Sequence, residues 1–138
     1  MPKNNLTEGT IEKLEKNVDL KVDLSFINEI DFEKYPYTLI IKSKTKRCFR
    51  ITLYLLEKNE IVKLSLNGEN ISDNILEKLS QILHRYEIIH TSGLLVKKKQ
   101  LFYECYLNMT KNSEEFVRLT QKLEEIRSVF NSLEITQI

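Results

Sequence analysis

The sequence has few of the residues on which several classes of small protein depend. Its 138 residues include three glycines, two prolines, two cysteines and no tryptophan. So little glycine excludes a glycine-rich phosphate loop and a flexible linker, and it predicts short connections between elements. The cysteines, Cys48 and Cys105, are too far apart for a zinc knuckle and too few for a disulfide framework, so we expect two buried thiols.

Residues with the chemistry of an active site are also scarce. There are only two histidines, His84 and His90, and none of the spacings HxH, HExxH, CxxC or GxSxG occurs. On the predicted hairpin His90 lies two residues from Ser92, which faces Cys105 on the next strand, a loose grouping that we interpret as core packing. We therefore predict no catalytic residue, no metal site, no cofactor and no enzymatic activity.

The chain lacks an excess of charge of either sign. Lysine and arginine together number 21 against 20 acidic residues, a net charge of +1, so the long-range field of a dedicated nucleic-acid-binding protein is missing. Basic residues do gather at two predicted hairpin turns, where lysines also keep sheet edges from associating, so we expect no nucleic-acid partner. This basic patch consists of Lys44, Lys46, Arg47, Lys97, Lys98 and Lys99.

Long hydrophobic runs are absent as well. No segment approaches the roughly 18 apolar residues that a membrane-spanning helix needs, and the N-terminal residues form no apolar leader. We therefore expect a cytoplasmic protein with no membrane partner. Hydrophobic residues make up 41% and charged residues 30%, a balance typical of a folded chain, and the length predicts a single domain over 1–138.

The first 60 residues carry mainly strand signals. Residues 1–19 are predicted to form a short helix or tail, and a strand is expected over 20–26, where apolar and polar residues alternate. An antiparallel meander then follows over 37–42, 48–56 and 61–66. In its middle strand we predict that one face lies in the core: Phe49, Ile51, Leu53 and Leu55.

Residues 61–138 alternate between strands and helices. After the breaker Asn67-Gly68, apolar residues at helical spacing predict a helix over 73–86. Two strands joined at 97–100 follow, then a second amphipathic helix that opens on a capping box of Asn112 and Glu115, and a short last strand. The predicted fold class is α+β: an antiparallel sheet with two amphipathic helices packed on one face, a ferredoxin-like βαββαβ unit over 61–138, preceded by antiparallel strands over 20–60.

The hairpin at 87–109 has large apolar groups on both faces. If Val96 pairs with Leu101, the two helices cover only one of these faces, and the other needs a separate cover. We predict that this second face forms a homodimer interface, with its carboxylate paired to a lysine. Its residues are Ile89, Leu95, Phe102, Glu104 and Tyr106.

The segment IVKLSL, the loop NGENIS, the helix NILEKLSQILHRY and the helix SEEFVRLTQKLEEIRSVF follow one another in residues 61–138. In this order the segment resembles the ACT-type regulatory domains, which have the ferredoxin-like fold and bind small molecules. The resemblance implies a ligand loop at Asn67, Gly68, Glu69 and Asn70.

The leading functional prediction is a non-enzymatic regulatory or adaptor domain that dimerises and binds a small ligand. An alternative is a protein-interaction scaffold that uses an exposed sheet edge or a helix face. A less favoured alternative is a nucleic-acid-binding accessory protein that uses the lysine-rich turns.

Overall fold

The computed structural model of the protein describes residues 9–11, 13, 16, 19, 21 and 29–138. The strand predicted over 20–26 and most of the segment predicted as a helix or tail therefore lie outside the described residues. The described part contains two α-helices and seven strands, the mixed α+β composition that the sequence predicts. No helix among the described residues is long and apolar enough to cross a membrane.

The main sheet is antiparallel and has the predicted ferredoxin-like strand order. Its strands are β3 (Val62–Glu69), β4 (Ile88–Thr91), β5 (Leu95–Lys97), β6 (Gln100–Leu107) and β7 (Ser132–Gln137). They are ordered β4-β6-β3-β7, and the short β5 continues the β4 edge by pairing with β6. Helix α1 (Asp73–Leu83) connects β3 to β4, and helix α2 (Glu114–Glu124) leads through a 3-10 turn, η1 (Arg127–Val129), to β7.

The core lies between this sheet and the two helices. The apolar face expected of the second amphipathic helix is confirmed, because Leu119 and Leu123 are fully buried and Ile126, just after the helix, is nearly so. On the sheet, β3 buries alternate residues and β6 contributes Leu101, Cys105 and Leu107. The helix itself begins one residue later than predicted, because its N-cap is Ser113, whose hydroxyl accepts a hydrogen bond from the Phe116 amide at 3.1 Å.

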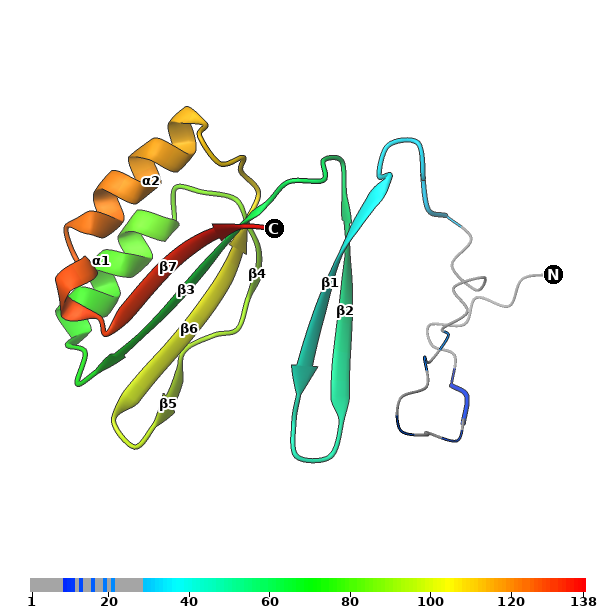
Figure 1. The fold of residues 1–138 in the computed structure, drawn as a ribbon, viewed down its shortest axis with the longest axis horizontal. Coiled ribbons are helices and arrows are strands. Elements are labelled where there is room, and N and C mark those ends of the chain that lie inside the picture. Colours follow the sequence, from blue (N-terminus) through cyan, green and yellow to red (C-terminus); the bar gives the residue numbers. More distant parts are fainter. Residues whose placement is uncertain (1–8, 12, 14–15, 17–18, 20, 22–28) are drawn as a thin grey trace.

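Strands β1 (Tyr37–Lys44) and β2 (Phe49–Leu56) form a separate two-stranded sheet. The predicted meander is therefore wrong at its last step, since β3 pairs with β6 and β7 instead of β2. The β1–β2 hairpin lies on the side of the main sheet opposite the helices (Figure 1). A small second core joins the two sheets, in which Leu39, Ile41 and Ile61 are buried and are packed by Tyr54, Leu56, Ile89 and Tyr106.

The face of β2 that was predicted as core is instead exposed. Leu39 pairs with Tyr54 and Ile41 pairs with Thr52, so these side chains lie on the inner face, toward the main sheet. The alternate residues consequently point outward, with exposed fractions from 43% for Leu53 to 69% for Phe49. Because β1 buries Leu39 and Ile41, the register of the hairpin decides which face of β2 is covered.

Candidate functional site

The joint between the hairpin and the main sheet is built on three aromatic rings. The Tyr54 hydroxyl of β2 hydrogen-bonds to Nδ1 of His90 in β4 at 2.7 Å. The His90 ring meets Tyr54 edge-on, with centroids 5.5 Å apart, and meets Tyr106 in the same way at 6.0 Å. Such T-shaped pairs are stabilising beyond their buried area, so this contact fixes the hairpin against the sheet.

A β-bulge places His90 at this joint. The pairing of β4 with β6 shifts between Ile88, opposite Leu107, and His90, opposite Tyr106. The extra residue moves His90 to the hairpin side of the sheet, whereas Thr91 lies opposite Cys105. The grouping of His90, Ser92 and Cys105 that the alternating pattern predicts is therefore wrong.

An ion pair lies beside these rings on the same face. Lys63 Nζ is 3.2 Å from the Glu104 carboxylate and 5.5 Å from the Tyr106 ring centroid. Partial burial lowers the pKa of Lys63, but the hydrogen bond and charge of Glu104 outweigh that effect, so the pKa lies above its ordinary value. The prediction that Glu104 pairs with a lysine is confirmed.

The predicted interface face is thus divided into two parts. Ile89 and Tyr106 pack against the chain's own hairpin, and Glu104 is paired within the sheet. Leu95 and Phe102 remain exposed, at 53% and 37%. The sequence correctly indicates that this face needs a cover, but the β1–β2 hairpin supplies much of it.

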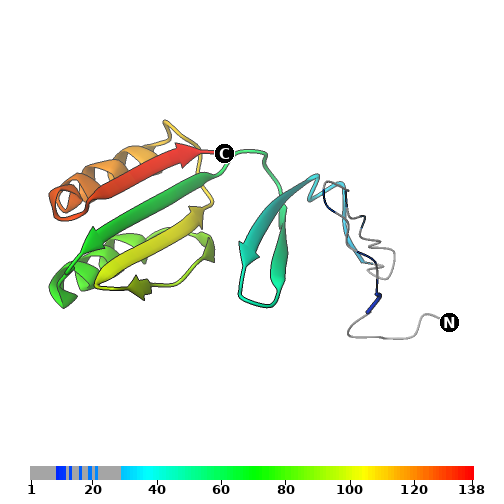
Figure 2. The same ribbon diagram turned by 60° about the horizontal axis from the view of Figure 1, so that its bottom comes forward.

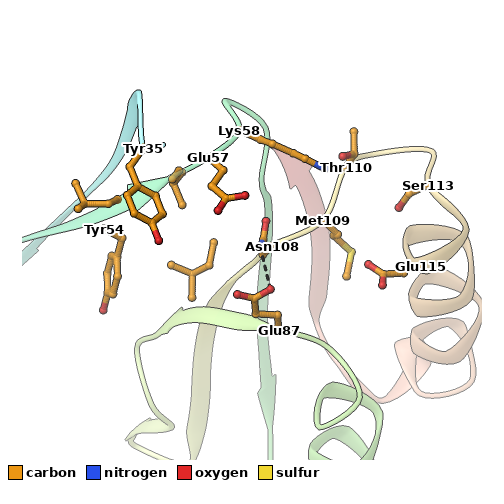
Figure 3. Close-up of a pocket in the computed structure, with 13 residues that line it drawn as sticks. Tyr35, Tyr54, Glu57, Lys58, Glu87, Asn108, Met109, Thr110, Ser113 and Glu115 are labelled. Carbon is orange, nitrogen blue, oxygen red and sulfur yellow. Dashed lines mark hydrogen bonds between the residues drawn. The ribbon is translucent and has the colours of Figure 1, made fainter. Parts of the chain in front are cut away.

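A cavity of about 740 Å³ opens at one end of the joint (Figure 3). Its walls come from the hairpin, from the ends of β4 and β6, and from the first turn of α2. The carboxylates of Glu57, Glu87 and Glu115 point into the same space, and Glu87 accepts a hydrogen bond of 2.9 Å from the Asn108 amide. Tyr35, Tyr54 and Met109 supply aromatic and apolar walls and Lys58 lines the cavity too, so three carboxylates against one ammonium group favour a small ligand with a cationic group.

The predicted ligand loop does not form as a loop. Asn67, Gly68 and Glu69 belong to β3, where they pair with Phe102, Leu101 and Gln100. A Cβ at Gly68 would lie 2.6 Å from Ile71 Cδ1, so this glycine permits close packing. Asn70, at a left-handed φ of 51°, ends the strand, and neither this residue nor its three neighbours lines the described cavities.

The two predicted basic turns lie at the same end of the molecule. The turn between β1 and β2 and the turn between β5 and β6 both lie toward the lower edge in Figure 1; in Figure 2, which is rotated from it, the first points downward and the second lies at the lower left of the main sheet. All six predicted basic-patch residues are exposed. Two clusters far apart in the sequence therefore make one basic end, a relationship that the turn positions alone do not reveal.

The remaining candidate residues are His84 and the two cysteines, and none of them lies in the joint or lines the 740 Å³ cavity. His84 caps α1 through its backbone amide and lines a small groove beside Leu94. Cys105 is fully buried, and burial raises the pKa of its thiol to about 11. Cys48 is exposed in the β1–β2 turn, 2.9 Å from the Thr45 hydroxyl, so its prediction as a buried thiol is wrong. The described residues contain no group of three or more side chains placed to hold a metal ion.

Sequence analysis missed one surface because it assigned that surface to the core. The outer face of the β1–β2 hairpin carries five exposed apolar residues, with exposed fractions between 43% and 69%. They are Ile40, Phe49, Ile51, Leu53 and Leu55. The alternation in 48–56 is a clear signal for an apolar face, but it does not say which element covers that face.

Comparison of the chain with protein-family models, with curated proteins and with solved structures finds no match. The ACT-type resemblance therefore stays a prediction, and functional proposals depend on the geometry alone.

Proposed function

We propose that the protein is a non-enzymatic regulatory or adaptor domain that dimerises through the outer face of its β1–β2 hairpin. The observation that carries this proposal is the row of five large apolar side chains on that face. Neighbouring pairs such as Ile40 with Leu53 bring them together across the two strands. A contiguous exposed patch of this kind is uncommon on a monomer and is typical of an association surface.

The arrangement of charge on this face favours a second copy of the chain as the occupant. Lys42 and Lys44 lie on the same face near the β1–β2 turn, opposite Ile51 and Phe49. In a two-fold symmetric dimer with antiparallel hairpins, the apolar centre of this face packs against the same centre on the second copy. The lysines of the two copies then lie at opposite ends of the interface. This arrangement also covers the hairpin on its second side, which a two-stranded ribbon needs for stability.

The test is the solution mass of the purified protein at tens of micromolar, measured by light scattering. We expect a dimer of the 16.4 kDa chain. Leu53→Lys should give a monomer, because it places a charge at the centre of the interface. Val117→Lys on α2 is the matched control, since Val117 has a similar exposed fraction of 46% against 43% for Leu53. A monomeric wild-type protein or a dimeric Leu53→Lys variant would contradict the proposal. The outer face of the hairpin would then be a binding site for a different protein.

Small-ligand binding is a second candidate function, favoured by the 740 Å³ cavity. Its volume lies in the range of small-molecule sites, and its walls come from both sheets, so a ligand there would contact the hairpin and the sheet together. A thermal-shift screen against amino acids and nucleotides tests this candidate. A stabilising compound should lose its effect in Glu87→Gln and keep it in Glu134→Gln, a carboxylate on β7 outside the cavity lining. A stabilising compound that acts equally on both variants does not use this cavity.

A further inference from the structure

The basic end of the molecule combines cations with exposed aliphatic side chains. We propose that this end docks on a lipid bilayer surface that contains anionic headgroups. The apolar contacts of this proposal come from the β5–β6 hairpin, whereas the proposed dimer face belongs to β1 and β2 and shares Lys42 and Lys44 with the basic end. The proposal concerns a peripheral contact, for which no membrane-spanning helix is needed, and it revises the expectation of no membrane partner.

The charge at this end is high and uncompensated. The segments 42–50 and 94–102 contain no acidic residue. None of their cations forms an ion pair with a described residue, and all of them are exposed. These cations are Lys42, Lys44, Lys46, Arg47, Arg50, Lys97, Lys98 and Lys99. Glu69, the acidic neighbour across from Gln100, accepts a hydrogen bond from that amide at 3.2 Å. The net charge of +1 therefore conceals a strongly basic end.

The acidic side chains of the cavity lie at the other end of the hairpin–sheet joint. Glu57 follows β2, Glu87 precedes β4 and Glu115 opens α2, all at the ends of elements remote from the two basic turns (Figures 1 and 3). The protein is thus polarised along its strands. A polarised charge distribution orients the basic end toward an anionic surface, even when the total charge is close to zero.

The β5–β6 turn places lysines at its apex despite an unfavourable backbone. Lys97 pairs with Gln100, so Lys98 and Lys99 form a two-residue turn, with φ values of 48° and 68°. Turns with two left-handed residues strongly favour Asn-Gly, because a side chain with a Cβ is strained there. Two lysines are unfavourable at these positions, and the turn places both of their charges at its tip.

The aliphatic neighbours of the β5–β6 lysines favour lipid over nucleic acid, although two aromatic rings, Phe49 and Phe102, are also exposed at this end. Leu94, Leu95 and Val96 are 50%, 53% and 66% exposed and directly precede Lys97. Aliphatic side chains cannot stack on bases as aromatic rings do. They do partition into the boundary between headgroups and acyl chains, where lysines beside them meet lipid phosphates and carboxylates. The pattern of exposed aliphatics beside cations therefore fits an anionic bilayer surface.

The test is co-sedimentation of the purified 138-residue chain with vesicles. We expect binding to phosphatidylcholine vesicles that contain about 30 mol % phosphatidylserine, little binding to phosphatidylcholine alone, and weaker binding as salt is raised. In Lys98→Asn/Lys99→Gly the turn receives its preferred residues, so the fold is kept while two charges are lost. Each lysine near the surface should be worth about a factor of five in affinity, so this variant, which loses two, should bind roughly thirtyfold more weakly.

Two matched controls separate the surface from general effects of charge and hydrophobicity. Lys78→Gln/Lys122→Gln removes the same charge from the helices, and it should bind as the wild type does. Leu95→Ser/Val96→Ser should also weaken binding, whereas Val117→Ser/Val129→Ser should not. The proposal is overturned if the Lys98/Lys99 and Leu95/Val96 variants lose no more vesicle binding than their controls do. It is also overturned if the wild-type protein does not bind vesicles. Salt-sensitive binding to single-stranded or duplex oligonucleotides without vesicle binding would assign the basic end to nucleic acid instead.

Discussion

Tyr54 and His90 are joined by a hydrogen bond of 2.7 Å between the tyrosine hydroxyl and Nδ1 of the imidazole. Among the described residues it is the side-chain hydrogen bond that links the β1–β2 hairpin to the main sheet, and it is partly buried. Around it lie the few apolar residues of the second core, Leu39, Ile41 and Ile61. A small core with one such bond makes the position of the hairpin sensitive to single substitutions.

Tyr54→Phe should therefore lower the free energy of unfolding by about 0.5–1.5 kcal/mol, because it leaves the ring in place and removes one partly buried hydrogen bond. Chemical denaturation measures the loss. His90→Leu should cost a similar amount, and the double variant should cost less than the two single effects added together, since both remove the same bond. Additive losses would show that the two side chains are not coupled.

Gly68→Ala should destabilise the protein by about 1–2 kcal/mol, although alanine is normally the better strand residue. The new Cβ would lie 2.6 Å from Ile71 Cδ1 and 3.2 Å from Phe130 Cδ1. Ile71→Val removes that Cδ1 atom, so Gly68→Ala should cost less in the valine background. An unchanged midpoint for Gly68→Ala in denaturant would mean that the end of β3 relaxes freely.

Leu123→Ala on α2 should destabilise the protein by about 2–5 kcal/mol, because Leu123 is fully buried between the helices and the sheet. Val117→Ala on the same helix is the matched control, since Val117 is 46% exposed, and it should change stability by less than about 0.5 kcal/mol. Urea titrations of the two variants give the comparison. Similar losses in both would mean that α2 packs through a different face.

The ferredoxin-like unit could be predicted because its signals are local and agree with one another. Leu119 and Leu123 recur at helical spacing, and Val96 opposite Leu101 in the hairpin is confirmed in the structure. The order of strands and helices then leaves few topologies in which every apolar face is covered. Asn67-Gly68 misled the prediction, because the pair is typical of turns but lies within β3 through pairing that the local sequence does not encode.

The candidate site could not be predicted from local sequence patterns, because it depends on strand register and on tertiary contacts. Both faces of β2 carry large apolar residues, so only its register with β1 and the contact of Tyr54 with His90 decide which face is buried. The bulge between Ile88 and His90 breaks the period of two by one residue and moves the histidine to the opposite face. The cavity, the basic end and the outer apolar face all follow from how the hairpin docks, which is a tertiary property.

Cys105 predicts how stability changes at alkaline pH. Burial raises the pKa of its thiol to about 11 in the folded protein, above its ordinary value of 9.0. A folded-state pKa above the unfolded value means that the neutral thiol is favoured by folding. Its contribution is therefore complete below about pH 9 and is lost as the pH rises toward 11. The free energy of unfolding should fall by on the order of 2–3 kcal/mol over this interval through Cys105 alone.

Lys63 and Tyr103 also have raised pKa values, so part of the alkaline loss belongs to them. The contribution of Cys105 is isolated by Cys105→Ala, which should be less stable than the wild type at neutral pH because it leaves a small cavity, yet should lose less stability between pH 8 and 11. Exposed Cys48 provides the matched control, since Cys48→Ala removes a thiol without removing a buried one. Denaturant titrations across this pH range should therefore give parallel curves for the wild type and Cys48→Ala, and a shallower curve for Cys105→Ala. A curve for Cys105→Ala that stays parallel to the wild type would mean that ionisation of this thiol does not limit the fold at high pH.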